Sequence, residues 1–208
     1  MSGANIIKKK QNNWTKSFQL LEDFREKTLE SKEGIPEKQT IKIKEKAIEI
    51  LNKCPNPKSN KKKQEVGLVM GDVQSGKTLS FTSLAVSALE NGYEIVILLA
   101  GTKQNLWDQN HNRIKDCLYY SRQYAISKND NALSAQSIKA ILNNSLNRHL
   151  IITSMKNTNG LNRLKKTIQD LIKIHPLKSI MIIDDEADQA SMNTKDSEND
   201  PNKTINDP

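Results

Sequence analysis

Aromatic residues are scarce in this sequence, at only 4% of its 208 residues. A buried core must therefore consist mainly of aliphatic side chains, and Ile and Leu supply most of them, with 22 and 20 copies. Together with Val and Phe these residues number 50, a larger fraction than intrinsically disordered chains usually carry. The length fits one compact domain with extensions, so the sequence predicts a single aliphatic core.

Long apolar runs and paired cysteines are also missing. No stretch reaches the roughly 20 apolar residues that a membrane-spanning helix requires, and residues 1–10 lack the apolar stretch of a secretory signal. We therefore expect a cytoplasmic protein that does not contact membranes. The two cysteines, Cys54 and Cys117, are far apart and accompanied by only three histidines. Neither a disulfide framework nor a zinc site is indicated, and both thiols are expected to be reduced.

Acidic residues are outnumbered over most of the chain. Residues 1–65 carry 16 basic and 9 acidic side chains, residues 66–183 carry 14 and 7, and the last 25 residues carry 2 and 8. A basic body suits nucleic-acid phosphates, because contacts with Lys and Arg release bound counterions. A solvated surface rich in Lys would have the same composition, so the charge leaves both interpretations open.

The spacing of apolar residues predicts helices first and an alternating pattern afterwards. Two amphipathic helices, around 14–24 and 43–51, indicate a basic helical extension with a linker over residues 1–63. From residue 64 strands alternate with helices; the expected strands are 66–70, 95–99, 150–152 and 180–183. Continuous apolar strands separated by helices are typical of an α/β fold, a parallel sheet with helices on both faces, here expected over 64–191. Residues 192–208 form an acidic polar tail with nothing to bury.

The strongest motif lies between a predicted strand and a predicted helix. It matches the phosphate-loop pattern, with these residues in order: Gly71, Asp72, Val73, Gln74, Ser75, Gly76, Lys77, Thr78. The glycines let successive backbone N–H groups turn toward a phosphate chain, and the helix N-terminus adds its positive end. Lys77 is predicted to reach the β- and γ-phosphates of ATP, and Thr78 to place its hydroxyl on Mg²⁺. A glycine turn beside a surface lysine is the alternative.

An acidic cluster follows the last predicted strand, at the edge where open α/β sheets bind ligands. It contains Asp184, Asp185, Glu186 and Asp188. Neighbouring carboxylates repel one another, and a divalent cation held against a triphosphate compensates for this repulsion. Asp185 is predicted to hold Mg²⁺ through water, with Asp184 as the competitor for that role, and Glu186 to orient or deprotonate the attacking water. An acidic helix cap is the alternative.

Two further loops follow strands on the same edge. Thr102 and Lys103 come after the second predicted strand, and Ser154 and Lys156 after the third. Hydroxyls and lysines of this kind bind a nucleic-acid backbone without reading its sequence, so these four residues are the candidate nucleic-acid contacts. They are equally consistent with ordinary polar loops. The tyrosines at 119, 120 and 124 are suited to stacking on bases, although core or interface positions are the more common use of such residues.

The acidic segment Asp185-Glu186-Ala187-Asp188 spells the second motif of superfamily-two helicases, so residues 64–191 resemble the first RecA-like lobe of those motors. A closer resemblance is to the bacterial "Z-one domain" family, whose members carry the label endonuclease. It is carried by the phosphate loop with its Val-Gln-Ser flank, by Leu99-Ala100-Gly101-Thr102 with Leu106 and Gln109, and by residues 184–191 with their Asp-Gln-Ala-Ser ending.

The resemblance implies a P-loop NTPase that binds ATP and Mg²⁺ at the residues named above, with Gln74 and Gln189 lining the site. Members of the family are helicase-like ATPases encoded beside restriction, nuclease or mismatch-repair-like genes in anti-phage defence loci. DNA and other defence proteins are therefore the implied partners, although nothing in the sequence distinguishes DNA from RNA. No separate metal-binding carboxylate set supports nuclease chemistry.

Family members continue beyond this point, so we expect the chain to be a fragment that ends before a second lobe. Arginines of that lobe would stabilise the transition state, and without them ATP binding is expected to outlast hydrolysis. A nucleotide-gated protein-interaction module is the alternative function. A small-molecule kinase is less favoured, since no arginine-rich lid follows Thr78. Gln39 and Gln64 are candidate readers of the base and fit equally well as surface residues.

Overall fold

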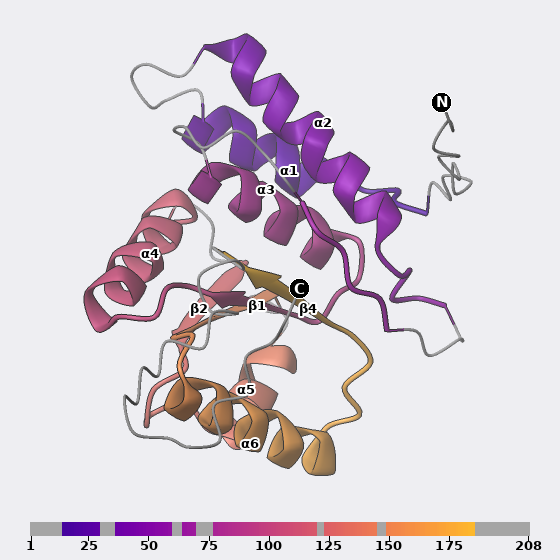
Figure 1. Cartoon of the computed structure of the whole chain (residues 1–208). Coiled ribbons are helices and arrows are strands. Elements are labelled where there is room, and N and C mark those ends of the chain that lie inside the picture. The colour runs from indigo at the N-terminus through magenta and orange to yellow at the C-terminus, as the bar shows by residue number, and fades with distance from the viewer. Residues whose placement is uncertain are drawn as a thin grey trace, which may run out of the picture.

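The computed structural model describes residues 14–29, 36–59, 64–69, 77–119, 123–144 and 149–185. Helices and strands alternate over most of these ranges (Figure 1). In chain order they are α1 (Gln19–Phe24), the π-helix η1 (Arg25–Leu29), α2 (Glu37–Lys53), α3 (Lys77–Glu90), β1 (Ile95–Leu99), α4 (Gln104–Cys117), β2 (Tyr124–Lys128), α5 (Ala135–Leu142), β3 (His149–Ser154), α6 (Thr158–Ile174) and β4 (Ile180–Asp184).

The four strands form one parallel sheet in the order β2-β3-β1-β4. In the centre of this sheet Ile97 of β1 lies between Ile152 of β3 and Ile182 of β4. Each connection between successive strands contains a helix, as parallel pairing requires. The predicted α/β class with an all-parallel sheet is therefore confirmed.

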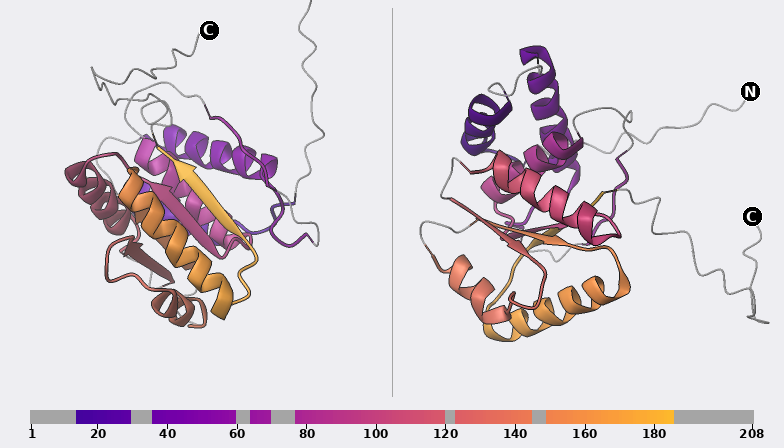
Figure 2. Two further views of the ribbon diagram at one scale, coloured as in Figure 1. Left: turned by 60° about the horizontal axis from the view of Figure 1, so that its bottom comes forward. Right: turned by 90° about the vertical axis from the view of Figure 1, so that its left-hand side faces the viewer.

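Helices cover both faces of the sheet (Figure 2). Val96 and Leu98 of β1 face a core shared with α1, α2, α3 and α4, whereas Ile95 and Ile97 face a second core shared with α5 and α6. Successive side chains of a strand point to opposite faces, so an uninterrupted apolar strand supplies both cores at once. The aliphatic composition is used as expected, because Ile and Leu dominate both cores.

The N-terminal helices pack on α3 and belong to the same core as the sheet. Leu21 and Phe24 of α1 and Leu51 of α2 are fully buried there. Asn91, at the end of α3, is buried and binds the chain before α1: its Oδ1 accepts from Lys16 N at 2.8 Å and its Nδ2 donates to Ser17 O at 2.7 Å. Residues 14–29 and 36–54 therefore form an outer layer over α3.

Most expected elements are confirmed: β1 has the expected bounds, α2, β3 and β4 are longer than expected, and α1 begins at Gln19 and not near residue 14. α3 ends just before Asn91-Gly92, and Gly92 has a φ of +112°, a backbone conformation that glycine adopts most easily. In the described part of the chain, no helix is long and apolar enough to span a membrane.

Two expectations about strands are wrong. Residues 66–69 form no regular structure, and Val66, Leu68 and Val69 are exposed to 94%, 77% and 63%; Met70 lies outside the described residues. No described strand pairs with this run, and an extended segment without a pairing partner gains no ladder of hydrogen bonds. Conversely, Tyr124–Lys128 forms the edge strand β2, where the sequence predicted no strand.

Candidate functional site at the carboxyl edge of the sheet

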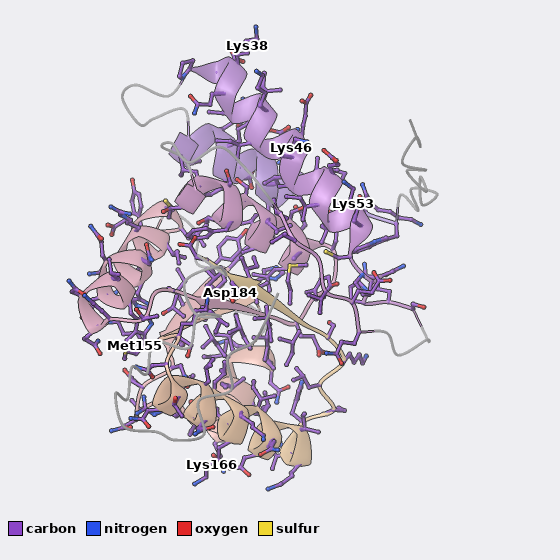
Figure 3. The ribbon with its side chains drawn as sticks, in the orientation of Figure 1. Lys38, Lys46, Lys53, Met155, Lys166 and Asp184 are labelled. Carbon is purple, nitrogen blue, oxygen red and sulfur yellow. The ribbon has the colours of Figure 1, made fainter. Side chains whose placement is uncertain are left out.

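All four strands end at one edge, and the candidate residues follow those ends. Thr102 and Lys103 lie between β1 and α4, Ser154 ends β3, and Asp184 ends β4. Figure 3 labels Met155, beyond the end of β3, and Asp184 among the side chains of this region. A parallel sheet brings the carboxyl ends of its strands together, which is why residues far apart in sequence meet here.

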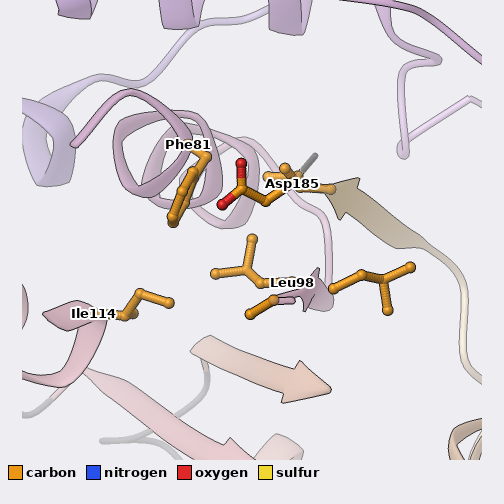
Figure 4. Close-up of a pocket in the computed structure, with 7 residues that line it drawn as sticks. Phe81, Leu98, Ile114 and Asp185 are labelled. Atoms are coloured by element: carbon orange, nitrogen blue, oxygen red, sulfur yellow. The ribbon is translucent and has the colours of Figure 1, made fainter. Parts of the chain in front are cut away.

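Asp185 lies against α3, the helix that begins at Lys77. It lines a small cavity of about 10 Å³ together with Phe81 of α3, Leu98 of β1, Ile114 of α4 and other apolar residues. Figure 4 shows the Asp185 carboxylate on the side of Phe81, just beyond the end of β4. This space is a packing gap with room for about one water molecule. Phe81, near the beginning of α3, and Asp185, at the acidic end of β4, therefore lie close together.

The two neighbouring aspartates face opposite sides of the sheet. Met181 and Ile183 of β4 pack in the core on the α3 side, and Asp185 continues that side. Ile180 packs on the α5 and α6 side, and Asp184 points to that same side because it lies four positions further along the strand. Asp184 forms an ion pair with Lys156, with 2.7 Å between Asp184 Oδ1 and Lys156 Nζ.

Backbone hydrogen bonds join the loops on this edge. Ala100 N donates to Ser154 O at 2.9 Å, Lys156 N to Gly101 O at 2.8 Å, and Asp185 N to Leu99 O at 3.2 Å. Gly101 has a φ of +76°, and a Cβ there would meet Leu106 Cβ at 2.9 Å. A glycine at this position lets the chain turn sharply from β1 into α4.

A buried polar cluster lies beneath the loop after β3. Trp107 Nε1 donates to Thr153 Oγ1 at 3.1 Å, and His111 Nδ1 lies 2.9 Å from the same hydroxyl. Because the indole N–H can only donate, the hydroxyl proton of Thr153 remains available to His111 Nδ1, which is consistent with a neutral imidazole protonated at Nε2. Burial is the main cause of a lowered pKa at His111, and the nearby lysines Lys128 and Lys115 add to it.

Asn129 connects the end of β3 to the first turn of α6. Its Nδ2 donates to Ser154 Oγ at 2.8 Å and to Gly160 O at 2.9 Å. A Cβ on Gly160 would collide with the backbone oxygen of Met155, so only glycine fits this close approach. Asn157 caps the same helix by accepting from Gly160 N at 2.8 Å.

The structure describes some of the predicted site residues and not others. Thr102 and Lys103 are exposed, Thr78 is half-buried in the first turn of α3, and Asp185 is half-buried beside that helix. Lys77 begins α3, but its side chain lies outside the described residues. The remaining phosphate-loop residues, Glu186 and Gln189 also lie outside them: the loop comprises Gly71, Asp72, Val73, Gln74, Ser75 and Gly76.

The prediction that Ser154 and Lys156 contact a nucleic acid needs correction. Ser154 is completely buried and accepts a hydrogen bond from Asn129, and Lys156 is 8% exposed and paired with Asp184. Both side chains therefore satisfy partners inside the protein. Among the other candidates, Tyr119 is 84% exposed and Tyr124 is buried, while Tyr120 lies outside the described residues. Gln39 on α2 and Gln64 before α3 are both exposed.

Sequence reasoning missed the internal contacts of this edge. The pairing of Lys156 with Asp184 and the Trp107–Thr153–His111 cluster join residues between 28 and 46 positions apart. The one hint in the sequence was the composition of the loops. A lysine that directly follows a buried strand has few possible partners for its charge inside the protein.

No group of three or more His, Cys, Asp or Glu in the described ranges could hold a metal ion by itself. Asp185 and the half-buried Thr78 are oxygen donors, which suit Mg²⁺ when phosphates and water supply its other ligands. Comparisons with protein-family models, curated proteins and solved structures found no match to this chain.

Proposed function

We propose that this chain binds ATP with Mg²⁺ and forms the first, RecA-like motor lobe of a helicase-like ATPase that acts on DNA in a restriction or anti-phage defence system. The observation that carries the proposal is the contact between α3 and the acidic end of β4. α3 begins with the Lys-Thr of the phosphate-loop pattern, and its Phe81 lines the same gap as Asp185. Phe81, three positions after the end of the motif, and Asp185 of the acidic cluster thus line one gap although they are more than 100 positions apart in the sequence.

The geometry supports separate roles for the two aspartates. Asp185, on the α3 side, is the proposed Mg²⁺ ligand through water, and Thr78 supplies a second oxygen. Asp184 faces the other side and is paired with Lys156, so it is not the proposed metal ligand. Lys77 binds the β- and γ-phosphates, and Glu186 orients the attacking water. Bound ATP supplies the phosphoryl group that is transferred to water, and Mg²⁺ neutralises its charge.

The direct test is nucleotide binding by the purified chain, measured with a fluorescent ATP analogue. Lys77→Ala removes charge-assisted hydrogen bonds, each worth about 1.5–3 kcal/mol. We therefore expect binding to weaken by about 10- to 100-fold. Lys46→Ala is the matched control, since Lys46 is an exposed lysine of α2 that pairs only with Glu49 among the described interactions.

Equal affinity of the Lys77→Ala and unaltered chains would reject the site assignment. Turnover is tested separately, by adding DNA to the chain with and without Glu186→Gln. Slow ATP hydrolysis that DNA accelerates and Glu186→Gln abolishes is expected for a motor lobe. Nucleotide binding that is coupled to association with a protein, and is unaffected by nucleic acid, would favour the second candidate function.

That second candidate is a nucleotide-gated protein-interaction module. The exposed apolar run Val66, Leu68 and Val69 favours it, because contiguous exposed apolar side chains often mark protein contacts. This run immediately precedes the phosphate-loop motif in the sequence, so it is adjacent to the residues that are proposed to bind the nucleotide. Nucleotide-dependent association of the chain with a protein, in the absence of DNA, is the result that would distinguish the module from the motor lobe.

A further inference from the structure

A buried lysine at the carboxyl edge has no role in the proposed nucleotide site. Lys156 is 8% exposed, and its Nζ lies 2.7 Å from Asp184 Oδ1. Lysines are rarely buried unless they are paired, because removing an ammonium group from water is costly. The pair is therefore a specific feature of this edge, formed by two residues 28 positions apart.

The ion pair reaches across the sheet. Lys156 follows β3 and Asp184 ends β4, while β1 lies between these strands in the sheet. The backbone of Lys156 is itself fixed, since its N–H donates to Gly101 O at 2.8 Å. The adjacent Asp185 N–H donates to Leu99 O at 3.2 Å. One ion pair and two backbone bonds thus hold the end of β4 against the loops after β1 and β3.

We infer that Lys156 is a positioning residue for the proposed magnesium site. By holding Asp184 on the α6 side of the sheet, it fixes the next residue, Asp185, on the α3 side, where the metal ligand is needed. Lys156 contacts neither nucleotide nor metal in this scheme, and acts through its ion pair with Asp184. This inference rests on the proposed function. It gives Lys156, which was predicted from the sequence to contact a nucleic acid, a role at the magnesium site.

The experiment measures binding of a fluorescent ATP analogue to the full chain while Mg²⁺ is titrated. The variants are Lys156→Met, Asp184→Asn and the double variant. Losing a partner that orients a metal ligand typically weakens metal affinity by about 10- to 100-fold. We expect the Mg²⁺ concentration for half-maximal binding to rise about tenfold in each single variant. The double variant should show no larger shift, because all three break the same pair.

Lys128→Met is the matched control. Lys128 Nζ also lies 2.7 Å from a carboxylate, Asp108 Oδ1, at the carboxyl end of a strand, but on β2 at the far side of the sheet from β4. Its loss should leave the Mg²⁺ midpoint unchanged. Thermal unfolding of each variant is recorded in parallel, since a merely structural role for Lys156 would lower the unfolding temperature without moving the Mg²⁺ midpoint.

A wild-type Mg²⁺ midpoint in folded Lys156→Met would overturn the inference, and so would additive shifts in the double variant. If Lys156→Met does not fold, Asp184→Asn decides the question, because it breaks the pair from the side that is 36% exposed. Failure of the unaltered chain to bind the analogue at any Mg²⁺ concentration would instead overturn the proposed function, and would remove the metal site that Lys156 is inferred to position.

Discussion

At the scale of single residues, His111 shows how burial sets the chemistry of one side chain. It is 8% exposed, and its ring faces the Thr153 hydroxyl on β3. Charged groups around it are Lys128, Lys115, Asp108 and Asp130. Burial and the two lysines lower its pKa from the ordinary value of 6.5, and outweigh the two aspartates, which raise it.

This lowered pKa predicts acid sensitivity of the fold. The unfolded chain takes up a proton near pH 6.5 and the folded chain only at lower pH, so stability present above pH 6.5 is lost as the pH falls below it. We expect His111→Gln to flatten the dependence of the denaturation midpoint on pH between about pH 5 and 7. Chemical denaturation at several pH values measures this. Identical pH profiles for the variant and the unaltered chain would contradict it.

At the scale of elements, α1 depends on a residue from another helix. Its N-cap, Phe18, has no side chain that accepts a hydrogen bond, and Glu90 of α3 takes over this function. Glu90 Oε1 accepts from Leu20 N at 3.0 Å and from Ser17 Oγ at 2.7 Å, and Oε2 accepts from Leu21 N at 3.3 Å. These are the second and third amides of the helix, the ones that a capping side chain normally satisfies.

Removing this cap should destabilise the N-terminal layer. Glu90→Ala leaves two helix amides without their acceptor, and loss of a capping side chain costs about 1–2 kcal/mol. We expect a lower free energy of unfolding and faster hydrogen exchange at Leu20 and Leu21. Glu49→Ala, which removes exposed ion pairs with Lys46 and Lys53 on α2, should leave the denaturation midpoint unchanged. Equal effects of the two substitutions would contradict the capping role of Glu90.

Strands illustrate where local pattern succeeds and where it fails. β1 is a continuous apolar run and β3 contains a short one, and both strands were predicted within two residues at each end. Val66–Val69 is also mostly apolar but remains exposed, because a strand also requires a neighbour to pair with. β2 was missed for the opposite reason. As an edge strand it needs few apolar residues, and its pairing with β3 supplies the hydrogen bonds.

At the scale of the whole molecule, basic charge is distributed over several faces. Figure 3 shows Lys38, Lys46 and Lys53 along α2 and Lys166 on α6, on opposite sides of the protein. This distribution resembles a solvated surface more than a single polyanion-binding stripe. Specific contact with DNA would therefore depend on residues of the carboxyl edge, where Lys103 is exposed next to Thr102.

A contact between Lys103 and a DNA phosphate can be tested by measuring DNA binding. If it binds a phosphate, Lys103→Ala should weaken binding of a labelled DNA oligonucleotide and reduce the slope of log affinity against log salt concentration by about 1. The measurement covers roughly 50–200 mM salt, where such contacts change affinity strongly. Lys173→Ala is the control, since this exposed lysine near the end of α6 pairs with Asp170, away from the edge. Equal slopes for Lys103→Ala and the unaltered chain would exclude a phosphate contact at Lys103.

Local sequence was sufficient for the elements whose determinants are local: the apolar strands β1, β3 and β4, the amphipathic helices, the glycine stop after α3, and the positions of Thr102 and Asp185 just beyond strand ends. The opposite orientation of Asp184 and Asp185 follows from the alternation of side chains in a strand, once β4 is known to extend to Asp184. Local sequence did not reveal which face lies against α3, that Lys156 would be buried on Asp184, or that Glu90 would cap α1. Those outcomes depend on the order of strands and on contacts between residues 28 to 70 positions apart, which arise only when the chain is folded.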